Sequence, residues 1–212
     1  MYTLEIVSDI VCPWCFIGSR RLSAAVELVR REQPDFRYQA IWRPFFLNPD
    51  TPPQGEPYLP FLEHKFGSRA KVEEIFSRVR TAGEACGIDY AFEKIALRAN
   101  TLLAHRLLHW AQARGNADAL VERLFSAQFQ RGEPVGDPQV LTTCAADCGY
   151  DATEVAAFLA SNQGEAEVRQ QVAEVARMGI TMVPTFILPG QQMIVGAEEP
   201  AILAEAIRRG IK

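Results

Sequence analysis

Two cysteines near the start of the chain have the spacing and the surroundings of a reactive thiol pair. Cys12 and Cys15 are separated by Pro13 and Trp14, and the apolar run Leu4-Glu5-Ile6-Val7 precedes them. Proline suits the first position of a helix, because its φ is already helical and its missing N–H would have no partner there. We therefore expect a strand that leads into a helix beginning at Cys12, where the free N–H groups of the first turn stabilise a negatively charged sulfur.

This arrangement favours a catalytic pair, with Cys12 as the nucleophile and Cys15, one turn deeper, as the thiol that resolves its adducts. Three alternatives compete with this role. A zinc site needs two more ligands, and Cys86, Cys144 and Cys148 form no second tight pair at zinc-finger spacing. A structural disulfide would close a very short loop and stabilise little. Two inert core cysteines are the third alternative, but the strand-to-helix junction suits exposure of Cys12. No metal ligands are assigned.

Composition indicates an ordinary globular protein. The chain has 212 residues, of which 48% are hydrophobic and 23% are charged. A formal net charge of −4 gives no support for nucleic-acid binding, which usually requires a basic surface. We find no run of 18 apolar residues and no basic-then-apolar leader, so we expect neither a membrane span nor export. Five cysteines are an odd number without the spacing of a disulfide framework. We therefore expect a cytoplasmic protein in which the pair cycles against a reducing glutathione pool.

The two ends of the chain carry the strand signals. Strands are predicted at residues 3–9 and 36–43, joined by a helix at 13–32, so the two strands should be parallel. Later strands are predicted at 185–188 and 193–195, and the Pro-Gly-Gln-Gln sequence between them indicates an antiparallel hairpin. Further helices are expected at 164–178 and 199–209.

The middle of the chain is predicted to be helical. A proline-rich, extended segment covers residues 44–57. Helices are expected at 58–66, 68–86, 99–114, 116–131, 137–148 and 151–162, with no clear strand among them. We therefore predict an α/β domain of residues 1–50 and 164–212, interrupted by a helical insertion domain of residues 51–163.

A late proline is the second candidate part of the site. Pro184 precedes the strand Thr185-Phe186-Ile187-Leu188, where a missing N–H is tolerated. If the Val183–Pro184 peptide bond is cis, the N–H and C=O of Val183 stay free to pair with an extended substrate backbone beside Cys12. Frequency alone favours the trans bond. The family resemblance described next favours cis.

The chain resembles the DsbA family of thiol–disulfide oxidoreductases, and within it the FrnE-like subgroup, which is related to 2-hydroxychromene-2-carboxylate isomerases and kappa-class glutathione transferases. The resemblance implies a thioredoxin fold with a large all-helical insertion, Cys12 as nucleophile, Cys15 as resolving cysteine and Pro184 as the cis-proline. It is carried by five stretches, namely Ser8-Asp9 through Arg21-Leu22, Trp42 through Pro49, Asn100 through Leu107, Val183-Pro184-Thr185-Phe186 and Gly196-Ala197.

Two functions follow from this resemblance. The first is dithiol–disulfide exchange with protein or small-molecule thiols and disulfides, with no tightly bound cofactor and with glutathione as a redox partner. The alternative is a glutathione-dependent isomerase or transferase, although those relatives carry serine at the position of Cys12. A redox-sensing or chaperone-like module without turnover is a third alternative. Relatives are often dimers, and the sequence leaves the oligomeric state open.

Five residues are candidates for substrate contact. Four of them flank the predicted thiol site, and His105 belongs to one of the family-like stretches; they are Pro13, Trp14, Val183, Pro184 and His105. The remaining cysteines are expected to be small packing residues. Cys144 and Cys148 share a helix face, where a second redox pair would fit disulfide geometry poorly.

Overall fold

A four-stranded sheet forms the centre of the computed structural model, which describes residues 2–211. Its strands are β1 (Tyr2–Ser8), β2 (Tyr38–Pro44), β5 (Thr185–Ile187) and β6 (Met193–Val195), in the order β2-β1-β5-β6. β2 runs parallel to β1, whereas β5 is antiparallel to both β1 and β6. The predicted parallel pair and the predicted hairpin are therefore confirmed, and both ends of the chain build one sheet.

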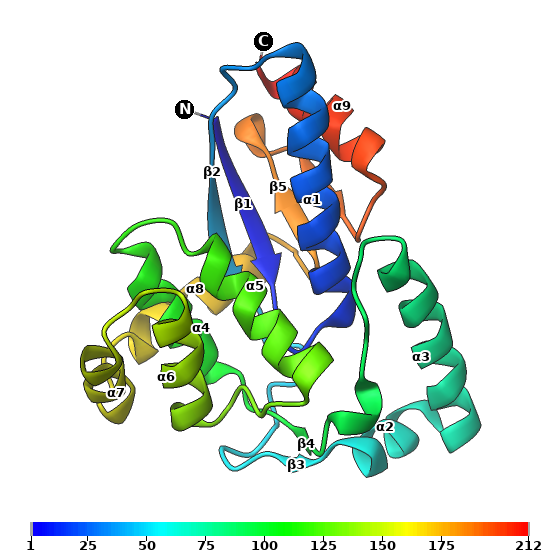
Figure 1. Cartoon of the computed structure of the whole chain (residues 1–212), viewed down its shortest axis with the longest axis vertical. Coiled ribbons are helices and arrows are strands. Elements are labelled where there is room, and N and C mark those ends of the chain that lie inside the picture. The colour runs from blue at the N-terminus through cyan, green and yellow to red at the C-terminus, as the bar shows by residue number, and fades with distance from the viewer. Residues whose placement is uncertain (1, 212) are drawn as a thin grey trace.

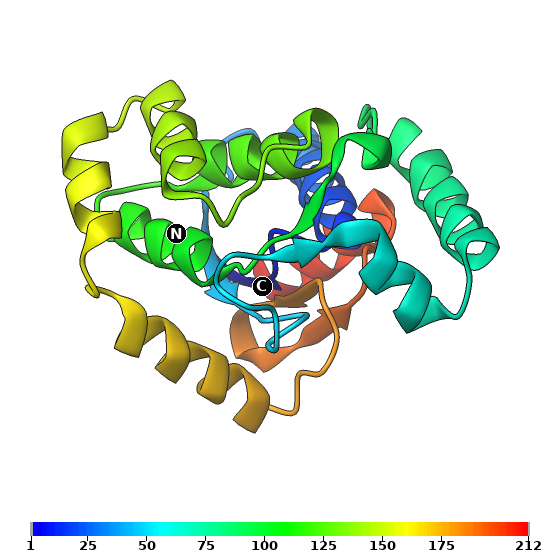
Figure 2. The ribbon, with the colours of Figure 1, turned by 90° about the horizontal axis from the view of Figure 1, so that it is seen from below.

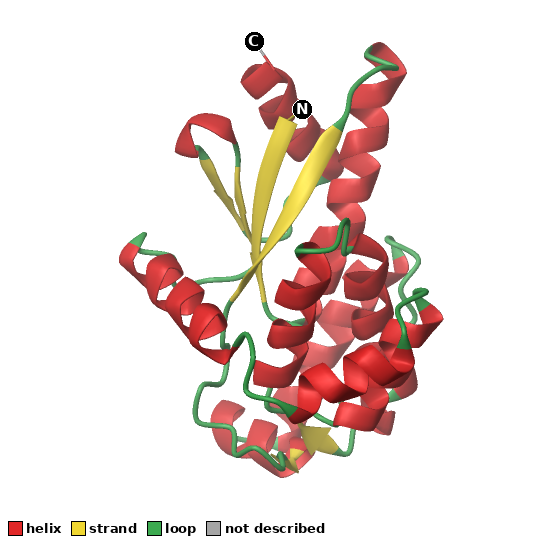
Figure 3. Cartoon of the chain, turned by 90° about the vertical axis from the view of Figure 1, so that its left-hand side faces the viewer, coloured by secondary structure: helices red, strands yellow, loops and turns green. Residues whose placement is uncertain are grey.

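Helices cover both faces of this sheet. α1 (Pro13–Glu32) and α9 (Pro200–Ile211) pack together on one face, and α8 (Glu165–Arg177) lies against the other (Figures 1 and 3). α1 buries Leu22, Val26 and Val29, whose spacing of three to four residues places them on one side of the helix. This packing fixes the direction of α1, and thus the position of its first residues, relative to β1.

The middle of the chain forms the predicted helical block. Its helices are α2 (Tyr58–Phe66), α3 (Arg69–Glu84), α4 (Leu102–Gln112), α5 (Asp118–Ser126), α6 (Pro138–Asp147) and α7 (Ala152–Ala160). Seen from below, they gather around the end of the sheet at which β1 finishes (Figure 2). Asp137 and Asp151 cap α6 and α7 with their carboxylates, which explains where these two helices begin. Within residues 2–211, no helix has both the length and the apolar character to cross a membrane.

One prediction about this block is wrong. Two-residue strands β3 (Glu56–Pro57) and β4 (Leu97–Arg98) pair in an antiparallel manner. β3 lies in the segment predicted to be extended, but β4 lies between residues 58 and 163, where no strand was expected. Gly55, with a φ of 76°, allows the approach, since a Cβ there would lie 2.9 Å from the carbonyl oxygen of Arg98. Two residues are too few to show strand alternation, so only the folded chain reveals this pairing. The division of the chain into two domains stays a prediction.

Candidate active site

Cys12 stands where the first strand turns into the first helix. It is the N-cap of α1, with extended backbone angles, and Pro13 occupies the first helical position. The Cys12 N–H donates to the carbonyl of Asp9 at 3.0 Å, and the Cys12 carbonyl accepts from the N–H of Cys15 at 3.0 Å. This tight turn directs the sulfur of Cys12 to the positive end of α1, the position that the sequence predicts.

The two thiols differ in access. Cys12 is 4% exposed and lines a cavity of about 380 Å³, together with Pro13 and Trp14. Cys15 is 1% exposed and lies behind Cys12, outside the residues that line the cavity. Cys12 is thus more buried than the strand-to-helix junction suggests, because α2 and α3 form the opposite wall of this cavity. A reagent in the cavity meets Cys12 first.

The surroundings of Cys15 favour its protonated form. Burial raises the pKa of Cys15 well above its usual range, and the adjacent Cys12 thiol raises it further. A backbone hydrogen bond from Asp9 and the buried hydroxyl of Ser8 oppose this shift in part. All cysteines within the described residues are free thiols. Cys15 is therefore held as a thiol at neutral pH, directly behind Cys12.

The Val183–Pro184 segment lies against Cys12. The thiol of Cys12 donates to the carbonyl of Val183 across 3.8 Å, and Val183 lines the same cavity. The Val183–Pro184 peptide bond is cis. Gly18 makes the approach feasible, since a Cβ at this position would lie 2.8 Å from Cγ of Pro184. Two segments far apart in the sequence therefore meet at one thiol.

A buried polar pair supports the turn before Cys12. The Nε2 atom of His105, on α4, lies 3.1 Å from Oδ1 of Asp9, and both side chains are buried. The other carboxylate oxygen of Asp9 accepts the backbone N–H of Leu47 at 2.8 Å. Because Asp9 also accepts the N–H of Cys12 through its own carbonyl, the pair ties α4 and the segment after β2 to the thiol turn.

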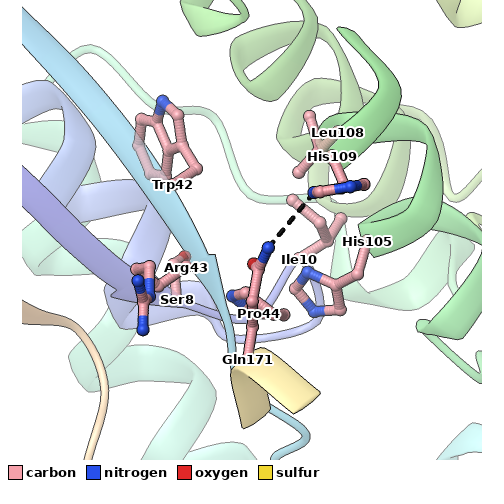
Figure 4. Close-up of a pocket in the computed structure, with 9 residues that line it drawn as sticks. All are labelled: Ser8, Ile10, Trp42, Arg43, Pro44, His105, Leu108, His109 and Gln171. Carbon is pink, nitrogen blue, oxygen red and sulfur yellow. Dashed lines mark hydrogen bonds between the residues drawn. The ribbon is translucent and has the colours of Figure 1, made fainter. Parts of the chain in front are cut away.

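His105 itself faces a different cavity from the one that Cys12 lines. This second cavity lies between α4, α8 and the carboxyl ends of β1 and β2 (Figure 4). Its volume of about 10 Å³ is far below the roughly 300 Å³ of the smallest ordinary ligand pockets. On its rim, Nδ1 of His109 is hydrogen-bonded to the Gln171 amide at 3.1 Å (Figure 4). His105 thus reaches the thiol pair through Asp9, from behind the turn.

Sequence reasoning missed three residues that lie at the site. The hydroxyl of Tyr90 donates to the carbonyl of Pro13 at 2.6 Å, and burial raises the pKa of this phenol. Phe16 stacks on Phe125 of α5 with ring centroids 5.1 Å apart, which anchors the first turn of α1 to the helical block. Gln128 lines the cavity from a π-helical turn, Ala127–Arg131, that continues α5. No local sequence pattern predicts these contacts, since the residues that meet are distant in the chain.

The other cysteines are separate from this site. Cys144 is fully buried in α6, and burial raises its pKa to about 11. Cys148 is the C-cap of the same helix, and its pKa is also raised by burial. Cys86 is half-buried beyond the end of α3. These positions agree with packing roles. Across residues 2–211, no group of three or more His, Cys, Asp or Glu side chains is placed to hold a metal ion.

Comparison with known proteins gives the same fold over nearly the whole chain. The crystal structure of a probable DsbA oxidoreductase from Streptomyces coelicolor matches with a TM-score of 0.89 and 29% identity, over 100% of this chain and 90% of that one. The cytosolic disulfide reductase DsbM from Pseudomonas aeruginosa, solved with GSH, matches with a TM-score of 0.68 and 17% identity, over 99% and 98%. At that identity, DsbM supports the fold alone.

The sequence comparisons agree with the structural ones. The uncharacterized protein YwbO of Bacillus subtilis (strain 168) is 27% identical over 206 residues, which cover 96% of this chain and 94% of that protein. The model of the DSBA-like thioredoxin domain matches residues 3–208. The α/β thioredoxin fold of the DsbA type, expected from the sequence, is therefore confirmed, and the chain belongs to the family of DSBA-like thioredoxin domains.

Proposed function

We propose that the protein is a thiol–disulfide oxidoreductase that acts by dithiol–disulfide exchange, with Cys12 as nucleophile and Cys15 as resolving thiol. The observation that carries the proposal is the difference in access within the pair. Cys12 lines an open cavity at the N-terminus of α1, and Cys15 lies directly behind it without lining the cavity. Membership in the DSBA-like family supports an activity of this kind.

The chemistry balances within the pair. The Cys12 thiolate attacks one sulfur of a substrate disulfide, a new S–S bond joins Cys12 to the substrate, and the second substrate sulfur leaves as a thiolate. Cys15 then loses its proton to solvent and attacks the Cys12 sulfur, which releases the bound substrate sulfur and leaves a Cys12–Cys15 disulfide. The substrate gains two electrons and the protein loses two. Two molecules of a thiol such as glutathione restore the dithiol.

Four residues are proposed to contact the substrate. Pro13 and Trp14 line the cavity beside Cys12, and Val183 lines it from the opposite segment. Val183 and Pro184 supply the backbone edge against which an extended substrate lies. The Val183 carbonyl, which accepts the Cys12 thiol in this structure, becomes an acceptor for a substrate N–H once Cys12 has formed a mixed disulfide.

Glutathione is the proposed redox partner. The structural neighbour DsbM was solved with GSH, and a small thiol of this kind would return the Cys12–Cys15 disulfide to the dithiol after each turnover. A cytoplasmic location stays a prediction. We assign no tightly bound cofactor.

Trapping tests the proposal. In Cys15→Ser, the mixed disulfide on Cys12 cannot be resolved, so adducts should accumulate when the reduced variant is incubated with cell extract. Non-reducing gels followed by mass spectrometry would identify them. Cys148→Ser serves as the matched control, because it removes a half-buried cysteine that lies outside the cavity and should leave the adduct pattern unchanged.

Two outcomes would contradict the proposal. Adducts that persist in a Cys12→Ser, Cys15→Ser double variant would show that another cysteine is the nucleophile. Glutathione as the sole adduct, together with glutathione-dependent turnover of an electrophile or an isomerisable substrate, would favour an isomerase or a transferase instead.

A further inference from the structure

The cavity beside Cys12 has apolar walls and basic residues, and within residues 2–211 no acidic side chain lines it. Its volume of about 380 Å³ lies within the range of roughly 300 to 1,000 Å³ that is typical of small-molecule sites. α2 and α3 contribute eight aliphatic and aromatic side chains to the wall, among them Leu62, Ile75 and Phe76. The two cationic side chains are Lys65 and Arg98. The walls therefore suit an apolar body that carries a negative charge.

A buried amide faces this cavity without a partner. Gln128 is 2% exposed and lines the cavity, and within residues 2–211 its side chain makes no hydrogen bond. The amide is largely buried and borders the cavity, so a ligand that fills the cavity can take up its free hydrogen-bonding capacity. The π-helical turn that carries Gln128 interrupts α5 at this point, and such turns occur often at functional sites. Gln128 thus offers a ligand both a donor and an acceptor.

The two cations are incompletely neutralised by the protein. Lys65 is exposed, forms no ion pair within the described residues, and donates only to Oδ1 of Asn48 at 3.1 Å. Burial and the nearby Arg98 lower the pKa of Lys65. Arg98 is buried and ion-paired with Glu56, but its Nε atom has no hydrogen-bond partner. An anionic group in the cavity would relieve the repulsion between these two cations.

We propose that this cavity binds a small aromatic or other apolar carboxylic acid whose sulfur is presented to Cys12 as a thiol or disulfide. The apolar body packs between α2 and α3, the carboxylate pairs with Lys65 and Arg98, and a polar substituent meets the amide of Gln128. This assignment rests on the proposed thiol–disulfide exchange, and names the substrate class for it.

A pair of aromatic disulfides tests the assignment. The probe is 5,5′-dithiobis(2-nitrobenzoate), which carries carboxylates, and 4,4′-dithiodipyridine is the neutral comparison. Reduced protein attacks either reagent through Cys12 to form a mixed disulfide and release one aryl thiolate. Cys15 then displaces the second, so the reagent is reduced by two electrons as the protein is oxidised. Stopped-flow absorbance gives the rate constants. The rate constant measured with Cys12→Ser is subtracted first, as the background for each reagent. The corrected rate constant is then divided by the rate constant of the same reagent with N-acetylcysteine.

The carboxylate reagent should be favoured by at least about tenfold after this normalisation, and the preference should fall as salt is added. Lys65→Gln should lower the rate constant for the carboxylate reagent by about fivefold and leave that of the neutral reagent unchanged. Lys94→Gln is the matched control, since it removes an exposed lysine that does not line the cavity. Gln128→Leu, which retains the side-chain size, should weaken saturable binding of the carboxylate reagent by about three- to tenfold.

The outcomes separate this inference from the proposed function. Equal normalised rate constants for the two reagents, with no effect of Lys65→Gln, would overturn the substrate class and leave the exchange chemistry intact. Another outcome is that a disulfide-containing peptide is reduced with a larger normalised rate constant than the carboxylate reagent, in the unmodified protein and in Lys65→Gln alike. That result would assign the cavity to an apolar peptide side chain instead. The absence of a Cys12-dependent reaction with either reagent would overturn the proposed function itself.

Discussion

The chain contains two closely spaced cysteine pairs, and they lie at opposite ends of their helices. Cys12 is the N-cap of α1 and lines a cavity, with Cys15 one turn behind it. Cys144 lies in the last turn of α6, and Cys148 is its C-cap. The N-terminus of a helix stabilises a negative sulfur and the C-terminus destabilises it.

Neighbouring charge and access increase this difference. Burial raises the pKa of Cys144 to about 11, and the carboxylate of Asp147 raises the pKa of both Cys144 and Cys148 further. Arg123 offsets part of this effect. Neither cysteine of the second pair lines the cavity beside α1. Two nearby thiols are therefore not enough for exchange chemistry, which also requires a favourable helix end and an opening to the substrate.

Removing one thiol from each pair gives the largest expected contrast. Cys12→Ser should lower glutathione-dependent reduction of a fluorescent disulfide peptide by at least about 1,000-fold, because the nucleophile is lost. Cys144→Ala should leave the rate within about twofold and cost about 1–2 kcal/mol of unfolding free energy, measured in urea, since it leaves a small cavity. A comparable loss of activity in a folded Cys144→Ala protein would show that the second cysteine pair also takes part in the exchange reaction.

Alkylation measures the same contrast without mutation. With a pKa of about 11, about 0.1% of Cys144 is ionised at pH 8, and its sulfur is buried. Iodoacetamide should therefore modify Cys144 at least about 100-fold more slowly than Cys12 in the folded protein, as followed by peptide mass spectrometry. In urea the two rates should converge. Similar rates in the folded state would show that Cys144 is accessible.

The pH dependence of the attack of Cys15 on the mixed disulfide tests its role as the resolving thiol. Burial raises the pKa of Cys15 above its usual range in the dithiol form. We expect the same burial to raise this pKa when Cys12 is held in a mixed disulfide. Below that pKa, each unit of pH adds about tenfold to the thiolate fraction, so release of the bound thiol should accelerate about tenfold per unit from about pH 6.5 to 8.5. Single-turnover kinetics of a preformed mixed disulfide measure this slope.

The Ser8→Ala variant tests whether the Ser8 hydroxyl influences the dependence of the release rate on pH. The Ser8 hydroxyl lowers the pKa of Cys15, so its removal should move the profile to higher pH without changing the attack of Cys12. A profile that is flat over this range, or unmoved in Ser8→Ala, would contradict the account of Cys15.

The smallest effect is expected from Gly18→Ala. The added methyl would lie 2.8 Å from Pro184 and 3.2 Å from Phe186, so α1 and the Val183 segment must separate. Overpacking of this kind costs about 1–3 kcal/mol, only partly offset by the better helix propensity of alanine. Exchange should slow by about threefold, through the lost contact between Cys12 and Val183.

Gly210→Ala is the control for this substitution. Gly210 is also a helical glycine, and the three atoms nearest to an added methyl there belong to the side chain of Tyr2. Its exchange rate should equal that of the unmodified protein. A Gly18→Ala protein with unchanged stability and unchanged rate would show that the contact between the two segments is not needed.

Much of this architecture could be predicted because its signals are local. Pro13 after Cys12 indicates a helix start, and the observed α1 begins at Pro13. Alternating and periodic apolar residues indicated the four strands of the main sheet and most helices to within a few residues. The β3–β4 pair was not predicted, because a strand of two residues is too short to show an alternation of apolar and polar side chains. The position of His105 was also not predicted. Its place in a family-like stretch does not indicate which of the two cavities the His105 side chain faces.

Three features could be predicted without the structure: the fold class, the thiol pair at a helix start and the proline that follows Val183. The thiol pair and the proline depend on residues adjacent in the chain, whose backbone preferences are set locally. The fold class depends on the order of the predicted elements and on the family resemblance. The folded structure was needed to show which thiol is accessible, that Ser8 and Asp9 affect the pKa of Cys15, and that Gln128 lines the cavity. Burial, hydrogen-bond partners and pKa depend on groups brought together by folding, and a sequence pattern does not contain those distances.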